Sequence, residues 1–311
     1  MKPTVFIHTS CHEILAANVA LYALKRMSCH ADDFETRIIR IESFPHILKY
    51  HGSKCIRNGK QAGWYKDVPQ SFLPLRFIVP QLMHYIGKAV VIDPDIFAVN
   101  DIYDLLTFDM AGKAILARPV LSGEKVISHN SSVMLLDCEK LTHWKWENQI
   151  DEVFAKKRDL QDWIGLNTED PEIVGDLPEE WNHYDTLNSK TKLLHNTTQI
   201  TQPWKTGLVY RPENLNNTYK GFNLSLGWFK KQIKLFLKGY KKTSFYRQHP
   251  DYNQEQLFFA LIKECLNNSL IDYNFIEQEI RKCHVRPDMI EKIQQVNLDV
   301  DEIKSRLLVT A

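Results

Sequence analysis

The feature that most constrains the fold is an apolar run that ends abruptly on two carboxylates. Lys88–Ile92 (KAVVI) is followed directly by Asp93-Pro94-Asp95. A short, continuous apolar run predicts a buried strand. Such a strand delivers Asp93 and Asp95 to the carboxyl edge of a sheet, where open α/β folds bind their ligands. The alternative interpretation is a strand-ending turn with Pro94 at its corner.

Strand and helix signals alternate along the first two thirds of the chain. This alternation predicts an α/β fold with a mainly parallel, mixed sheet flanked by helices. Ser10 and Glu13 stand at the spacing of a capping box at the start of the first helix. The predicted strands cover residues 4–8, 36–41, 88–92, 114–117, 132–136 and 192–195, and the predicted helices cover residues 14–27, 75–78 and 141–157.

The character of the sequence changes after Gly207, where strand signals fade and helical periodicity dominates. We therefore predict a ligand-binding domain over residues 1–207 and a mainly helical region over residues 208–311. Residues 214–250 contain no Asp or Glu, but they contain apolar residues at helical spacing and eight basic residues. The basic residues are Lys220, Lys230, Lys231, Lys234, Lys238, Lys241, Lys242 and Arg247.

This stretch predicts a basic amphipathic helix, for which two interpretations stay open. The helix either packs on the domain with a solvated lysine face or contacts an anionic membrane surface. Nucleic acid fits less well, because the aromatic residues fall on the apolar face, and the net charge of +1 gives no bulk attraction to it. We predict no nucleic-acid partner.

Composition indicates a soluble globular protein, with 44% apolar and 25% charged residues among 311. The six cysteines form no C-x-x-C pair, which argues against a zinc knuckle and favours reduced thiols. The sequence shows no signal-peptide core at Met1–Ser10 and no apolar stretch of the roughly 18 residues that span a bilayer. These features predict a cytoplasmic protein, with peripheral attachment at the inner membrane face as an option.

Two aspartates at i and i+2 suit a shared divalent cation, and their hard oxygen ligands favour Mg²⁺ or Mn²⁺. Asp299 and Asp301 have the same spacing but follow no buried strand, so we expect only a solvated helix face there. His195 follows the apolar pair Leu193-Leu194. It is either a packed residue or a third metal ligand, because imidazole is a good ligand for manganese.

These motifs resemble the family 8 retaining glycosyltransferases, the glycogenin-like group with the GT-A fold, from the first strand to about Gly207. In that family, a strand ends on an Asp-x-Asp pair that holds Mn²⁺ and the donor diphosphate. Asp93 and Asp95 match this pair, and Arg76 in the segment LPLRF stands where an arginine touches the donor. His195 matches the family's histidine motif near Pro203-Trp204, which implies a metal set of Asp93, Asp95 and His195.

The resemblance implies further roles around the donor sugar. Asn130, in the segment NSSVMLLD, would face the sugar. Gln161 and Asp162 would position or stabilise the sugar cation, and Thr9 would lie on the base side. The family's diphosphate-gripping lysine is replaced by Gln202, so Lys205 is the substitute candidate.

The resulting hypothesis is a metal-dependent enzyme that moves a hexose from a nucleotide diphosphate sugar, above all a UDP-sugar, to a hydroxyl group. The resemblance implies retention of configuration, with an unknown glycan or lipid-linked acceptor in surface glycan synthesis. One alternative is a sugar-phosphate nucleotidyltransferase, although the loop HTSCH over residues 8–12 lacks its glycines. Another is a non-catalytic sugar-nucleotide-binding protein. Cys11-His12-Glu13 lacks a second histidine at helical spacing and is interpreted as structural.

Overall fold

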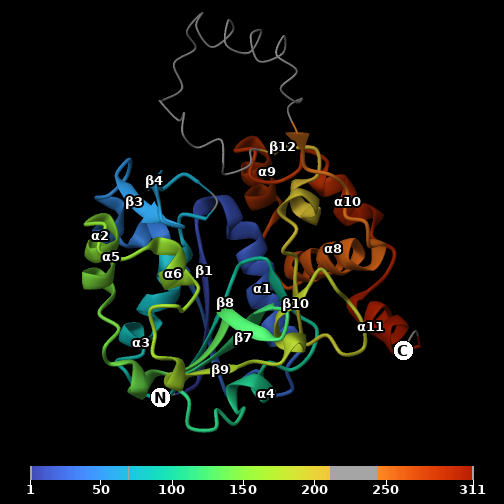
Figure 1. Cartoon of the computed structure of the whole chain (residues 1–311). Helices are drawn as coiled ribbons and strands as arrows, with labels where there is room; N and C mark the ends of the chain where they lie inside the picture. Colours follow the sequence, from blue (N-terminus) through green and yellow to red (C-terminus); the bar gives the residue numbers. More distant parts are fainter. Residues whose placement is uncertain (1, 69, 211–243, 310–311) are drawn as a thin grey trace, which may run out of the picture.

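The computed structural model describes residues 2–68, 70–210 and 244–309 (Figure 1). Its centre is a six-stranded sheet in which three pairings are parallel and two are antiparallel. The predicted α/β class with a mixed, mainly parallel sheet is confirmed. The strands, in spatial order, are β2 (Glu35–Arg40), β1 (Thr4–Thr9), β5 (Lys88–Ile92), β8 (Lys125–Asp137), β7 (Ile115–Ser122) and β9 (Val174–Asp176).

Apolar layers cover both faces of this sheet, which explains why β5 is apolar at almost every position. Val90 and Ile92 of β5 join the core on one face, whereas Ala89 and Val91 join the core on the other. The first face is covered by α1 (Ile14–Arg26), α4 (Tyr103–Leu106) and α8 (Tyr252–Asn267). The second face is covered by α2 (Pro45–Leu48), α3 (Val79–Leu82), α5 (Trp146–Phe154) and α6 (Leu160–Ile164) (Figure 1).

A small second sheet begins where β5 ends. After Asp93-Pro94-Asp95 the chain continues as β6 (Ile96–Ala98), which pairs antiparallel with β11 (Leu193–His195), and β11 pairs with β10 (His183–Tyr184). The register places His195 opposite Ile96. Strand pairing therefore brings His195 beside Asp95, although a hundred residues separate them in the sequence.

Two short hairpins and a helical C-terminal region complete the described chain. β3 (Lys54–Arg57) and β4 (Lys60–Gly63) are joined by Asn58 and Gly59, whose φ angles of 53° and 69° suit a tight hairpin turn. The second hairpin joins β12 (Val209–Tyr210) to β13 (Ser244–Phe245). The C-terminal helices are α8, α9 (Tyr273–Arg281), α10 (Met289–Gln295) and α11 (Val300–Val309) (Figure 1).

Two local predictions are wrong. The helix expected over residues 141–157 begins only at Trp146, because residues 138–141 form a 3₁₀ turn and a loop follows. The capping box is absent: Ser10 makes no side-chain cap hydrogen bond, and Glu13 turns instead to Trp204 and Lys205. The Glu13 carboxylate is buried with the Lys205 ammonium as its partner, so it is not available to the helix end.

The predicted basic helix lies largely outside the described residues, which resume at Ser244. The division at Gly207 remains a prediction, and apolar side chains of α8 share a core with α1. Within the described ranges, no helix combines the length and apolar character needed to cross a bilayer.

We predict that Phe258→Ala destabilises the whole fold, because α8 anchors through this ring to the small sheet. Phe258 is 1% exposed and lies 4.8 Å from the Trp204 ring and 5.4 Å from the Phe97 ring, between centroids. Removing it should lower the free energy of unfolding by about 3–5 kcal/mol. Urea denaturation measures the loss, with Phe245→Ala as control because Phe245 is 53% exposed. Equal midpoints in the two variants would contradict the prediction.

Candidate functional site

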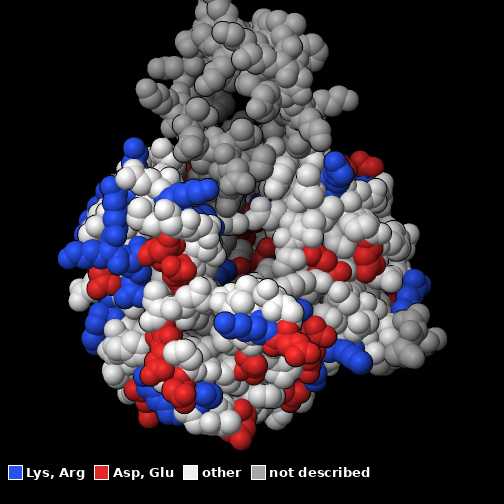
Figure 2. Space-filling view, viewed as in Figure 1, with Lys and Arg blue, Asp and Glu red and all other residues white. Residues whose placement is uncertain are grey.

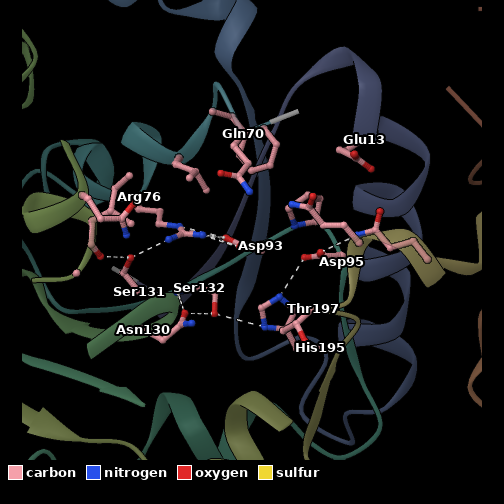
Figure 3. Close-up of a pocket in the computed structure, with 18 of the residues that line it drawn as sticks. Glu13, Gln70, Arg76, Asp93, Asp95, Asn130, Ser131, Ser132, His195 and Thr197 are labelled. Carbon is pink, nitrogen blue, oxygen red and sulfur yellow. Dashed lines mark hydrogen bonds and ion pairs between the residues drawn. The ribbon is translucent and has the colours of Figure 1, made fainter. Parts of the chain in front are cut away.

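The carboxyl end of β5, part of β8 and the turn after β1 line a cavity of about 430 Å³, within the usual range for small-molecule sites. Figure 2 shows a hollow near the middle of this face, with Asp and Glu side chains at its edge. Figure 3 shows polar side chains from several elements converging there. They include Glu13, Gln70, Arg76, Asp93, Asp95, Asn130, Ser132, Gln161, His195, Gln202 and Lys205.

Asp93 is held at the floor of the cavity by a buried cation. The Arg76 guanidinium, supplied by a 3₁₀ turn (Leu73–Ile78), donates to Asp93 Oδ1 at 2.6 Å and to Oδ2 at 2.5 Å. Ser131 Oγ accepts from the same guanidinium at 2.7 Å, which fixes its plane. Burial alone would raise the pKa of Asp93, but Arg76 and His8 outweigh it and hold that pKa below its usual value. Asp93 is therefore a carboxylate at any physiological pH.

His8 supports Asp93 from β1 as a neutral donor. Its Nε2 lies 2.7 Å from Asp93 Oδ1 and 3.1 Å from Arg76 Nε, and one nitrogen cannot donate to the first while accepting from the second. The shorter contact decides for Nε2–H donating to Asp93. Burial lowers the pKa of His8 more than Asp93 raises it, which favours this neutral ring.

Asp95 offers one free oxygen to the cavity. Its Oδ2 accepts from the Gln202 amide at 2.9 Å, whereas its buried Oδ1 has no hydrogen-bond partner among the described residues. A buried carboxylate oxygen without a partner is costly, so it marks a position where a ligand or cation belongs. Gln202 thus orients Asp95 and leaves its negative charge in place. The lysine that the resemblance leads us to expect at this position would neutralise that charge.

His195 turns its Nε2 toward that oxygen. Its Nδ1 donates to Asn182 Oδ1 at 2.8 Å, and the Asn182 amide donates onward to Ser132 Oγ at 2.9 Å. Because Asn182 holds Nδ1, Nε2 is the nitrogen that faces Asp95 Oδ1, at 3.5 Å. Fixing one ring nitrogen by a hydrogen bond is how proteins orient a metal-binding imidazole.

The donor set fits a divalent cation. Ligand atoms of Asp93, Asp95 and His195 all lie within 4.8 Å of one another. Bonds of about 2.1 Å would place neighbouring ligands roughly 3.0–3.5 Å apart, which matches the spacing between Asp95 and His195. An imidazole nitrogen and a carboxylate oxygen at this distance are placed to share a proton or a cation. The structure thus brings the three predicted ligands together.

Lys205 faces the cavity but is paired with Glu13 at the start of α1. The Lys205 ammonium forms an ion pair with Glu13 Oε1, and both side chains are 7% exposed. Burial would lower the pKa of Lys205, but Glu13 and Asp95 raise it, so the ammonium stays charged. Glu13 Oε2 also accepts from Trp204 Nε1 at 3.2 Å, which ties the first helix to residues 203–205.

The cavity carries one net negative charge when its histidines are neutral. Its lining contains three carboxylates, Glu13, Asp93 and Asp95, against two cations, Arg76 and Lys205. Such a cavity repels a diphosphate. A divalent cation reverses the sign of the net charge and would make the same cavity attractive to it.

The remaining predicted residues divide into two groups. Asn130 and Gln161 line the cavity, and Gln161 Oε1 accepts from Arg57 Nε at 3.2 Å. Thr9 is fully buried and Asp162 is exposed, and neither belongs to the described lining of the cavity. The structure therefore brings Gln161 to the site without Asp162.

Sequence reasoning missed several residues of the site. His8, Asn182 and Glu13 act through contacts that span from 13 to 192 residues along the chain. Gln70 was missed as well; Arg57 donates to its Oε1 at 3.1 Å and so holds both glutamines at the rim. The buried strand end before Ser10 was the one local signal that could have drawn attention to His8.

No protein-family model matches the sequence, and no curated protein matches it either. Among solved structures, the chain is similar to the glycosyltransferase GlyE of Streptococcus pneumoniae TIGR4, at 18% identity and a TM-score of 0.48 over 78% of this chain. The match covers 65% of GlyE, so the chain spans somewhat less than two thirds of that protein.

Two further structures show the same level of similarity. The galactosyltransferase LgtC, solved with donor and acceptor sugar analogues, matches at 12% identity and a TM-score of 0.44, covering 73% of this chain and 99% of LgtC. Mouse xyloside xylosyltransferase 1 matches at 15% identity and a TM-score of 0.42, covering 64% and 99%. Each is named a glycosyl-transferring enzyme, the class that the motifs resemble. Because these TM-scores lie below 0.5, function has to rest on the chain's own residues.

We predict that Glu13→Gln destabilises the protein by about 3–5 kcal/mol, because it leaves the Lys205 charge buried without a partner. The double variant Glu13→Gln/Lys205→Met should recover most of that loss. Urea denaturation of the single and double variants measures the coupling. The control is Glu277→Gln, which breaks an exposed pair with Arg281 at i,i+4 and should change little. Additive losses in the double variant would show that the two charges do not depend on each other.

Proposed function

We propose that this chain is a metal-dependent glycosyltransferase that moves a hexose from a nucleotide diphosphate sugar to a hydroxyl group. The observation that carries the proposal is the convergence of Asp93, Asp95 and His195, with an Asp95 oxygen that has no hydrogen-bond partner among the described residues, in a cavity of net negative charge. A divalent cation bound there would supply Lewis-acid stabilisation of the departing diphosphate. Mn²⁺ suits the mixed oxygen and nitrogen set, with Mg²⁺ as the other candidate.

The chain's own residues have distinct tasks in this proposal. Arg76 keeps Asp93 ionised and fixed, so its charge serves the metal site more than the leaving group. Lys205 is the charge available for a diphosphate, and it must share its ammonium with Glu13 to reach one. Asn130 and Gln161 present amide groups to the cavity, where they can orient sugar hydroxyls.

The finer features of the proposal come from the sequence resemblance. They are a UDP-sugar donor, retention of configuration, and a glycan or lipid-linked acceptor in surface glycan synthesis. Asp162 lies exposed, so any part it takes in the reaction requires it to approach the cavity. Thr9 on the base side likewise stays a hypothesis.

A non-catalytic sugar-nucleotide-binding protein is the second candidate. Gln202 favours it. The resemblance expects a lysine at this position, so Lys205 is left as the candidate to bind the diphosphate, and Glu13 already neutralises Lys205. Both candidates bind the donor in the presence of metal, and only the enzyme turns it over.

We predict that Asp95→Ala abolishes Mn²⁺-dependent binding of UDP-sugars and leaves the fold intact. A panel of nucleotide sugars, screened by thermal shift with and without Mn²⁺, identifies the donor, because binding at a hundredfold excess over Kd adds about 2.7 kcal/mol. His195→Ala should weaken apparent Mn²⁺ affinity by roughly ten- to a hundredfold or more.

Asp301→Ala is the matched control, because the exposed Asp299 and Asp301 repeat the spacing at the start of α11 and Asp301 pairs there with Arg26 at the surface. Turnover of the bound donor, followed as released nucleotide diphosphate, separates the enzyme from the binding protein. Near wild-type transfer by Asp95→Ala in Mn²⁺ would show that the metal assignment is wrong.

Peripheral contact with an anionic membrane remains a hypothesis based on the sequence of residues 214–250. Lysines near an anionic surface contribute about 1 kcal/mol each. We predict that the full chain sediments with anionic but not neutral vesicles, and that high salt or Lys230→Glu/Lys231→Glu/Lys234→Glu releases it. Equal recovery in the supernatant with both vesicle types would remove membrane contact from the proposal.

A further inference from the structure

A second cluster of metal-ligating side chains lies apart from the lining of the cavity. It joins Cys11 and His12, in the 3₁₀ turn (Cys11–Glu13) after β1, to His284 in the segment between α9 and α10. One ligand atom from each residue lies within 4.8 Å of the others, and all three residues are half-buried. The turn and the C-terminal segment are 272 residues apart, so only the folded chain makes this cluster.

The distances within the cluster fit a tetrahedral ion. Cys11 Sγ lies 3.5 Å from His12 Nδ1, and the His12 and His284 ring centroids are 4.7 Å apart. A tetrahedral zinc with bonds of about 2.3 Å to sulfur and about 2.0 Å to nitrogen separates these ligand atoms by roughly 3.6 Å. Thiolate and imidazole are the ligands that zinc prefers, whereas Mg²⁺ and Mn²⁺ prefer oxygen.

Two carboxylates outside the cluster hold its members in place. Glu279, whose side chain is 2% exposed, contacts His284 Nδ1 through Oε2 at 2.7 Å, so Nε2 is the His284 nitrogen left to meet an ion. Glu42 Oε1 accepts from the Cys11 backbone N–H at 2.7 Å and fixes the turn that carries the sulfur. A buried carboxylate behind a histidine is the usual outer support of a bound metal.

A comparison with a weaker cluster sharpens this assignment. Cys29, His30 and Asp101 also come together, but Cys29 and His30 are exposed. Their groups already have partners: Cys29 donates to Asp101 Oδ2 through both its N–H and its sulfur, and His30 Nδ1 contacts Asp33. In the first cluster, by contrast, all three residues are half-buried, Cys11 Sγ lies against the ring nitrogen of a fellow ligand, His12, and Glu279 contacts only one nitrogen of His284.

We propose that Cys11, His12 and His284 bind a zinc ion that fastens the turn after β1 to the C-terminal helical region. On binding, the Cys11 thiol gives its proton to solvent and its sulfur forms the bond to the metal. Three protein ligands leave the fourth position to a further donor, such as water. Glu13 is the last residue of this turn and pairs with Lys205 in the cavity, so the ion also fixes one wall of the donor site.

Cobalt is the probe, because a cysteine ligand gives Co²⁺ a thiolate charge-transfer band that the Asp93, Asp95 and His195 set cannot give. The metal-free full chain should develop this band on titration with Co²⁺ and lose it when Zn²⁺ is added. Cys11→Ser should abolish the band, and His284→Gln should weaken cobalt binding at least tenfold. Glu279→Gln should weaken it by roughly ten- to a hundredfold but retain the band at saturation.

Cys29→Ser is the matched control and should leave the band unchanged, since it alters only the exposed cluster. Circular dichroism shows whether each variant is folded, and His12→Gln replaces any variant that is not. A Zn²⁺-induced rise in melting temperature should accompany the band and disappear with Cys11→Ser. No band in the wild-type chain, an unchanged band in Cys11→Ser, or its loss in Cys29→Ser would each overturn the proposal. None of these outcomes depends on sugar transfer.

Discussion

The point at which β5 leaves the main sheet governs the rest of the site. Because β5 is buried on both faces, charged side chains are unfavourable within it, and the first carboxylate, Asp93, follows directly after its last residue. Pro94 redirects the chain into β6, whose antiparallel pairing with β11 then fixes where His195 lies. One change of direction thus sets both carboxylates and the imidazole, and a shift of register by one residue would turn His195 to the other side of its strand.

The charged side chains around this point are nearly balanced. The one negative charge that is left over favours the binding of a cation in the cavity. Arg76 neutralises Asp93, Lys205 neutralises Glu13, and Asp95 keeps its charge because Gln202 donates to it as a neutral amide. Burying these pairs is costly and contributes little net stability. What they provide is position: each carboxylate is held in one orientation while a single negative charge remains for a cation.

The sequence predicted those features that depend on local patterns. The apolar run before Asp93 predicted the strand with its correct bounds, and alternation predicted the α/β class. Features that depend on distant contacts were missed or misread. Glu13 was interpreted as part of a capping box, because a rule based on local spacing does not include the distant Lys205. Gln161 was grouped with Asp162, but α6 directs Gln161 to the cavity and leaves Asp162 exposed. Roles that rest on the resemblance alone, such as that of Thr9, remain predictions.

His12 shows the same limit from the opposite side. The missing second histidine at helical spacing predicts a structural role for His12, which stays a prediction, but a spacing rule does not detect that the fold brings His284 beside it from the far end of the chain. The two clusters that result differ in chemistry. Asp93, Asp95 and His195 offer mostly oxygen in a cavity open to a ligand, whereas Cys11, His12 and His284 offer sulfur and nitrogen beside it. Ligand type rather than affinity is what allows one protein to sort two metals. A hard cation at the first cluster and zinc at the second would therefore serve different ends, since the first would meet the donor phosphates and the second would hold the turn that carries Glu13.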